Sequence, residues 1–283
     1  MIDDIQRDSR HSVRRICDVL GLARSSCYGA RIETARQKED QTLGDHIERI
    51  FRLHQRRYGY RRIVDELADE GIACSDERAR RLMKKRNLLA IQPKSYVPRT
   101  SDGRADAPSP NLVAAQGVPT QPNQVLAGDI THIPTTRGWR YLAVVIDLGT
   151  RKIVGWKLAD HMRAELVIGA LAHANEQQSI KPGAVFHSDR GSPYGSRDFR
   201  SLLRSKKANQ SMSGRANAYD NAWSESAIGT IKAEVLQGGR FAGFEDAYTE
   251  LFDYIESYYN HRRKHSSLGY KTPFQYENLC YQN

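Results

Sequence analysis

Cysteine is scarce in this sequence, and long apolar runs are missing. The chain has 283 residues and four cysteines, none of them in the CxxC or His–Cys spacing of a zinc site. We therefore expect buried free thiols in a reducing compartment rather than a disulfide framework. No stretch is long and apolar enough to cross a membrane, and the first residues lack a signal-peptide pattern. These absences predict a cytoplasmic protein.

Acidic residues are outnumbered by basic ones, 33 against 43, which gives a formal net charge of +10. The excess lies mostly in residues 1–100, which hold 22 basic and 15 acidic residues, whereas residues 101–283 hold 21 and 18. A basic excess of this kind favours a polyanionic partner, most simply nucleic acid. The alternative is a basic surface that only keeps the protein soluble.

The first third of the chain reads as helical, and we expect a helix-turn-helix DNA-binding region over residues 1–92. Within residues 12–31, apolar side chains recur at helical spacing up to Gly21, and a second short helix can start at Arg24. In that arrangement Arg24 and Ser25 stand at the start of a recognition helix. A plain helical hairpin is the alternative.

Two further helices are expected in this region. In the segment "YGYRRIVDELADEGI", Ile63 and Leu67 form an apolar stripe that Gly71 ends, and Ser75 then caps the helix that follows. On this last helix the residues Arg78, Arg81 and Lys85 share one side, opposite Ala79, Leu82 and Met83. Such a basic face can follow DNA phosphates, or it can be a solvated charged face.

Residues 93–123 are rich in proline and small residues, which predicts a linker or an extended strap. Beyond it, over residues 124–283, short apolar runs predict three consecutive strands and then strands alternating with helices, with mainly helical structure after residue 219. This order predicts an α/β fold: a mixed sheet flanked by helices. The expected strands are 124–133, 139–150, 151–159, 184–188 and 209–213.

Three carboxylates stand at informative positions in this second part. We expect Asp129 to end the first strand and Asp189 to end the fourth, so that both lie at one edge of the sheet. On the helix predicted for residues 218–235, Glu225 lies opposite Trp223 and Ala227, which are expected to face the core. Three oxygen donors from separate elements suit Mg²⁺ or Mn²⁺. Two such ions about 4 Å apart stabilise both oxygens in a phosphodiester displacement.

Several polar residues near these carboxylates are candidates for DNA contact. Arg190 follows Asp189 directly and is placed to meet a phosphate. Asn221 and Lys232 lie within about 40° of Glu225 on a regular helix, so Lys232 either contacts the DNA end or is a solvated lysine. Glu234 lies off that face and is expected to be solvated.

The sequence stretches around these residues resemble those of a known family. The stretches "HSDRGSPYGS", "SMSGRANAYDNAWSES", "GTIK" and "YYNHRRKHSSLGYKTPFQYE" are similar to the second-frame product of the IS-three family of insertion sequences. The segments "YGYRRI" and "RRLMKKRNLLA" resemble the helical DNA-binding region that precedes its catalytic core. The sequence departs from the family at Ala227 and Ile228, where two aromatics are usual, and at Ala216, where glycine is usual. These changes affect packing rather than metal ligands.

The resemblance implies an RNase H-like fold of the integrase type, with Asp129, Asp189 and Glu225 as an acidic triad. It further implies Mg²⁺-dependent cleavage at the ends of a bacterial mobile element and strand transfer into target DNA. A homo-oligomer on double-stranded DNA, a product of an upstream reading frame as partner or fusion, and location at the nucleoid go with it. Two other functions stay open on the residues alone: an RNase H-like nuclease that never joins strands, and a non-catalytic DNA-binding regulator.

Overall fold

The computed structural model describes residues 11–23, 34–92, 108–114, 119–177, 179–214 and 222–282. The chain divides into two compact units, Met1–Ala90 and Ile91–Asn283. Within the described residues, no helix has the length and apolar character needed to pass through a bilayer. The candidates Arg24, Ser25 and Asn221 lie outside the described residues.

The first unit contains the helix α2, Val13–Leu20. Ser12 caps its first turn by accepting a hydrogen bond from the backbone N–H of Arg15, and Gly21 ends it with a left-handed φ of 65°. Val13, Ile16 and Cys17 are buried as expected. The apolar side chains were expected to stay buried up to Gly21, but Leu20 is 41% exposed, so the buried face ends one turn earlier.

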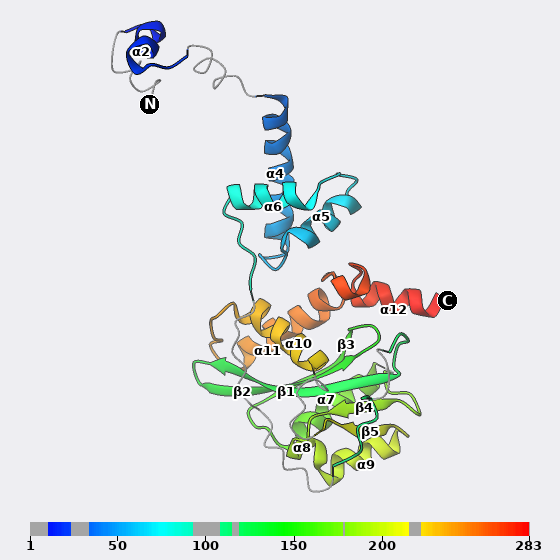
Figure 1. Ribbon diagram of the computed structural model, residues 1–283. Coiled ribbons are helices and arrows are strands. Elements are labelled where there is room, and N and C mark those ends of the chain that lie inside the picture. The colour runs from blue at the N-terminus through cyan, green and yellow to red at the C-terminus, as the bar shows by residue number, and fades with distance from the viewer. Residues whose placement is uncertain are drawn as a thin grey trace. The chain divides into compact units, whose positions relative to one another are not determined.

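Among its described residues the first unit has three further helices: α4, Ala35–Leu53, α5, Tyr60–Asp69, and α6, Asp76–Lys85 (Figure 1). A capping box between Thr34 and Gln37 starts α4, and the Ser75 hydroxyl starts α6, as its position in the sequence predicts. The three helices bury their apolar stripes against one another, which gives the unit its own core. Its buried residues include Leu43, Ile47, Ile50, Phe51, Ile63, Leu67, Ala79, Leu82 and Met83.

The second unit is built on a five-stranded mixed sheet in the order β3-β2-β1-β4-β5. β1, Val125–Thr135, and β2, Gly138–Asp147, form a long hairpin, and β3, Ile153–Ala159, continues the antiparallel meander. β4, Val185–Ser188, then pairs parallel with β1, and β5, Asn209–Met212, pairs parallel with β4. This confirms the mixed sheet predicted from the sequence.

Helices cover both faces of the sheet (Figure 1). The group on one face consists of α7, Ala164–Glu176, α8, Ser192–Gly195, and α9, Arg197–Ser205. On the other face lie α10, Ala222–Ile231, the π-helix η2, Lys232–Leu236, and α11, Phe244–Phe252. The chain closes with η3, Asp253–Tyr259, the 3₁₀ turn η4, Ser266–Leu268, and α12, Pro273–Gln282.

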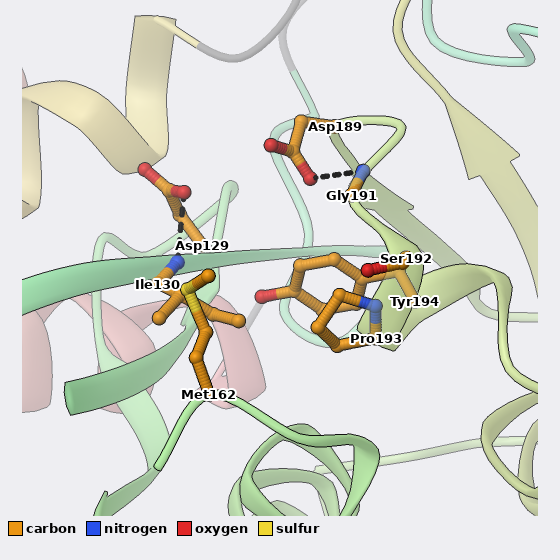
Figure 2. A pocket seen from close by; sticks show the side chains of 8 residues that line it. All are labelled: Asp129, Ile130, Met162, Asp189, Gly191, Ser192, Pro193 and Tyr194. Atoms are coloured by element: carbon orange, nitrogen blue, oxygen red, sulfur yellow. Dashed lines mark hydrogen bonds between the residues drawn. The ribbon is translucent and has the colours of Figure 1, made fainter. Parts of the chain in front are cut away.

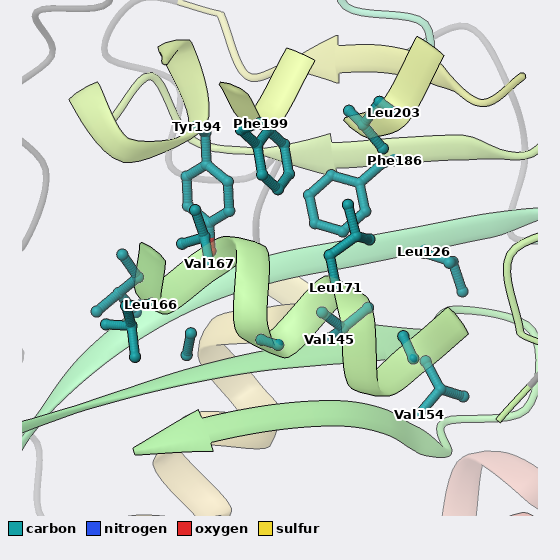
Figure 3. Packing of buried hydrophobic residues seen from close by; sticks show 14 of the residues in the cluster. Leu126, Val145, Val154, Leu166, Val167, Leu171, Phe186, Tyr194, Phe199 and Leu203 are labelled. Carbon is teal, nitrogen blue, oxygen red and sulfur yellow. The ribbon is translucent and has the colours of Figure 1, made fainter. Parts of the chain in front are cut away.

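The main core lies between the sheet and α7 (Figure 3). Leu166, Val167 and Leu171 of α7 pack on strand residues such as Val145 and Val154. Gly155 permits this close packing, because a Cβ at that position would stand 2.3 Å from the carbonyl oxygen of Ala170. The helix therefore sits directly on β3 and covers this face of the sheet.

Candidate active site

Asp129 and Asp189 are brought together by the parallel pairing of β1 with β4. In the last pair of the register Gly128 lies opposite Ser188. Asp129 and Asp189 are the residues that directly follow these two. Asp189 follows the end of β4 as expected. Asp129, in contrast, lies inside β1 rather than at its end, because β1 continues beyond β4 to pair with β2.

The two aspartates line one pocket at the edge where β4 stops and β1 continues. Figure 2 shows both carboxylates on the same side of β1, one projecting from the strand and the other from the loop after β4. The pocket is lined by Asp129, Ile130, Met162, Asp189, Gly191, Ser192, Pro193 and Tyr194.

The carboxyl group of Asp129 is almost completely buried, with 8% of the residue exposed. Burial, and then the negative charge of Asp189, raise its pKa to about 8. The backbone N–H of Ile130 donates to its Oδ1 at 2.8 Å and opposes that shift, while the charge of Glu225 adds to it. Asp129 therefore holds a proton at neutral pH unless a cation compensates its charge.

Asp189 is positioned by the turn that follows it. Its Oδ1 accepts a hydrogen bond from the backbone N–H of Gly191 at 2.9 Å. A Cβ on Gly191 would stand 3.0 Å from the same oxygen, so glycine allows the carboxylate to close this turn. His187 does not reach toward the pocket, because it is buried and its ring nitrogens lie at hydrogen-bond distance from Ser211 and Ser213 beside β5.

Arg190 holds the loop after β4 to the strand beside it. Its Nε donates to the backbone carbonyl of Ser213 at 2.8 Å, and the residue is half-buried. Arg190 follows Asp189 in the chain but is not among the residues that line the pocket.

Tyr194 belongs to the pocket although the sequence reasoning did not single it out. The residue is fully buried, and burial together with Asp129 and Asp189 raises the pKa of its phenol well above its usual range. Its ring packs so closely that a Cβ at Gly128 would collide with Phe186 and stand 3.2 Å from the Tyr194 ring. The only signal for it in the sequence was its place in "HSDRGSPYGS", five residues after Asp189.

Glu225 lies on the exposed side of α10 and does not line the pocket. It is near enough for its charge to raise the pKa of Asp129, but among the described residues no three His, Cys, Asp or Glu side chains gather as a metal-ligand cluster. Ala227 is buried against the sheet as expected. The expectation for Trp223 was wrong: it is 36% exposed and lies beneath the guanidinium of Arg151 rather than in the core.

Lys232 is the first residue of η2 and lies over β1. Its Nζ donates to Oγ1 of Thr131 at 3.4 Å, and burial lowers the pKa of the ammonium. Thr131 stands two residues after Asp129, on the same face of the strand. α10 is a regular α-helix up to Ile231 and changes to π at Lys232, so the spacing expected from Glu225 reaches the start of η2 and does not extend beyond it.

Glu234 is buried rather than solvated, which corrects the sequence-based expectation. Its carboxylate pairs with the guanidinium of Arg263 at 2.7 Å and accepts a hydrogen bond from the Tyr254 hydroxyl at 2.8 Å. The hydrophobic environment of the C-terminal helices could not be read from the position of Glu234 on one helix.

The basic face of α6 is partly neutralised inside the first unit. Arg78 and Arg81 each donate to Asp40 at 2.8 Å, and the two hydrogen bonds lower the pKa of that carboxyl. Lys85 is exposed, and no carboxylate within the described part of the chain pairs with it. Of the three predicted DNA contacts on this helix, Lys85 thus has the most accessible charge.

The comparisons with known proteins follow this division of the chain. Residues 119–218 and 206–273 match families described as "Integrase core domain", and residues 38–96 match an "HTH-like domain". The helix-turn-helix match thus falls on α4 to α6 rather than on residues 12–31. The fold is also similar to the solved HTLV-2 integrase catalytic core domain in complex with magnesium (18% identity, TM-score 0.43, 56% of this chain and 97% of that chain).

Two curated relatives align over nearly their whole length. The chain is 38% identical to the transposase for insertion sequence element IS904 of Lactococcus lactis, over 87% of this chain and 98% of the relative. It is 34% identical to transposase InsF for insertion sequence IS3A of Escherichia coli, over 96% of each. The chain therefore belongs to the IS3-type family of insertion-sequence transposases.

Proposed function

We propose that Asp129, Asp189 and Glu225 form the acidic triad of this transposase and that it works with Mg²⁺ or Mn²⁺, with two ions as the expected number. The observation that carries the proposal is the pairing of two aspartates from adjacent parallel strands in one pocket. Hard oxygen ligands of this kind suit Mg²⁺ and Mn²⁺. A pKa of about 8 for Asp129 fits a group whose charge is balanced by a bound cation.

The chain's own residues then have separate roles. Asp129 and Asp189 hold metal from the sheet, and Glu225 completes the set from α10. When bound, the ions would supply Lewis-acid stabilisation of the charge that develops on phosphodiester oxygens during cleavage and strand transfer. Tyr194 and Ile130 form the wall behind the carboxylates and limit the water around Asp129.

DNA is the partner that the charges around the pocket fit. We infer that Arg190 and Lys232 contact phosphates of the element end and that Asn221 belongs to the same surface. In the first unit, Lys85 contacts phosphate, while Arg78 and Arg81 shape the basic face through Asp40. Arg24 and Ser25 stay predictions for the start of a recognition helix. The active form is proposed to be a homo-oligomer on DNA, with an upstream-frame product as a possible partner or fusion.

Conservative amide variants test the triad. Asp129→Asn, Asp189→Asn and Glu225→Gln keep the shape of each side chain but remove the charge that holds metal. Each is expected to lower cleavage and strand transfer at least 100-fold in Mg²⁺, because the residues act as one unit, while affinity for the element end in a gel-shift assay stays near native.

Separate assays of cleavage and joining decide among the outcomes. Strand transfer from a pre-cut element end reports joining without cleavage. Near-native transfer by one variant would remove that residue from the triad. Cleavage without joining by the native chain would support a nuclease, and DNA binding without either reaction would support a regulator.

A further inference from the structure

Arg151 and Trp223 make a contact that links the β2–β3 turn to the first turn of α10. The guanidinium carbon of Arg151 lies 3.8 Å from the centre of the Trp223 ring, well inside the range of a cation–π interaction. Nη1 of Arg151 is buried and has no hydrogen-bond partner among the residues that the structure describes. The guanidinium thus contacts the indole face directly, within electrostatic reach of Asp147, Tyr259 and Tyr276.

The backbone of Arg151 is unusual for an arginine. Its φ is +62°, in the left-handed region that glycine or asparagine adopts with less strain. Arg56 and Lys207 adopt the same region, so the φ alone assigns no role, but it makes glycine the substitution that removes the guanidinium with the least backbone strain.

Hydrogen bonds to Asp147 hold the turn that carries Arg151. Oδ1 of the buried Asp147 accepts hydrogen bonds from the backbone N–H groups of Gly149 and Thr150, at 2.7 and 3.2 Å. The backbone N–H of Arg151 in turn donates to the carbonyl oxygen of Asp147 at 2.8 Å. The guanidinium thus projects from a turn between β2 and β3 whose backbone is held by hydrogen bonds.

Trp223, the partner of Arg151, lies on the face of α10 opposite to Glu225, so its contacts fix the direction in which Glu225 projects. Trp223 and Ala227 are four residues apart and share a face, and Ala227 packs in a core cluster with Ile146 and Leu148. Glu225 is two residues from each, so it projects about 160° away from them. Rotation of the helix about its axis is therefore limited by Ala227 and by the stack on Trp223.

We propose that Arg151 is a positioning residue for the reaction, acting through Trp223 to fix the rotation of α10 and with it the place of Glu225. The inference rests on the proposed role of Glu225 as a metal ligand. A carboxylate about 6 Å from the helix axis moves by about 2 Å when the helix turns by 20°. A displacement of about 1 Å can lower a rate 100-fold, so this contact matters.

The test uses the full chain and removes each half of the contact. Arg151→Gly takes away the guanidinium and suits the left-handed backbone, so the melting temperature is expected to stay within a few degrees of native or to rise. Strand transfer should fall at least tenfold, and the affinity for Mn²⁺ measured by calorimetry should fall several-fold. Lys207→Gly is the matched control, since Lys207 is an exposed cation of the same unit with a φ of +54°.

The partner variants test whether Arg151 acts through the ring. Trp223→Ala should show the same loss of strand transfer and Mn²⁺ affinity as Arg151→Gly. Trp223→Phe should keep most of the native activity, because it keeps an aromatic face. In Arg151→Gly/Trp223→Ala the losses should equal those of one single variant rather than multiply. Native transfer and Mn²⁺ affinity in Arg151→Gly, or multiplying losses, would overturn the inference.

Glu225→Gln separates this inference from the proposed function. If Glu225→Gln is inactive while Arg151→Gly is native, the triad stands and only the positioning role is lost. If Glu225→Gln keeps native transfer, the proposed function is wrong for that residue, and the positioning role is overturned with it.

Discussion

At the scale of single residues, Asp129 combines burial with a neighbouring charge of the same sign. Two carboxylates at the end of a parallel strand pair repel each other, and the buried one takes up a proton first. Binding of the proposed metal ions would therefore release this proton.

Stability of the metal-free chain should therefore fall as the pH rises. The folded pKa of Asp129 is about 8, above its unfolded value near 3.8, so the folded state binds the proton more tightly. Each pKa unit corresponds to about 1.4 kcal/mol, and the linked loss of unfolding free energy between pH 5 and pH 8 is on the order of a few kcal/mol. Denaturant unfolding at several pH values in EDTA measures it.

Asp129→Asn is the control for that pH dependence. The amide has no proton to lose, so the variant should be more stable than the native chain at pH 8 and show a flatter pH profile. Mg²⁺ should stabilise the native chain increasingly with pH and leave the variant nearly unchanged. A native chain whose stability in EDTA does not change from pH 5 to pH 8 would contradict the burial of this charge.

At the scale of elements, α10, the helix that carries Glu225, is held at both ends. In its first two turns Trp223 stacks on Arg151 and Ala227 packs on the sheet, and the helix continues into η2, where Glu234 pairs with Arg263 of the segment after η3. The pair is buried, with side-chain exposures of 7% and 6%, and the carboxylate raises the pKa of the Arg263 guanidinium. The C-terminal segment thus anchors the end of the helix that carries Lys232.

Breaking this buried pair should be costly. Glu234→Gln or Arg263→Met leaves one charged or polar group without its partner, and we expect a loss of about 3–5 kcal/mol of unfolding free energy. The double variant Glu234→Leu/Arg263→Met should lose less than either single variant, because no uncompensated charge stays buried. Urea unfolding of the three variants makes the comparison.

An exposed ion pair provides the contrast. Arg52 pairs with Glu48 four residues earlier on α4 and has a side-chain exposure of 74%. Arg52→Ala should change the unfolding midpoint only slightly, because water screens such pairs. Equal losses for Arg52→Ala and Arg263→Met would mean that Glu234 is hydrated in solution.

At the scale of the whole molecule, charge and chemistry are divided between two units. The first 100 residues carry most of the basic excess, and α4 to α6 have a core of their own. The second unit carries the acidic pocket, with Arg190 next to Asp189 in the chain and Lys232 bonded to Thr131 of β1. DNA binding and catalysis are therefore separable in principle.

A fragment of residues 1–92 is expected to bind double-stranded DNA on its own. Its affinity should fall steeply with salt, since each phosphate contact releases counterions. Lys85→Ala should lower the slope of log affinity against log salt by about one, whereas Arg78→Ala should chiefly lower stability because Arg78 is bound to Asp40. Fluorescence anisotropy at several salt concentrations checks this, and salt-independent binding would move DNA recognition to the second unit.

The sequence by itself determined which residues could do chemistry and in what kind of fold. Apolar periodicity specified the strands and helices, and the motif around Asp189 specified the family, because both are local patterns. Asp129, Asp189 and Glu225 were candidates on spacing and residue type alone. The burial of Ala79, Leu82 and Met83 followed from helical spacing in the same way.

Only the tertiary structure decided what surrounds those residues. Burial of Glu234, the stack of Arg151 on Trp223 and the capture of Arg78 by Asp40 join segments far apart in the chain. The pKa of Asp129 depends on the register that places it beside Asp189 in a poorly solvated pocket. Such properties arise from distances between elements, which periodicity along one element does not encode.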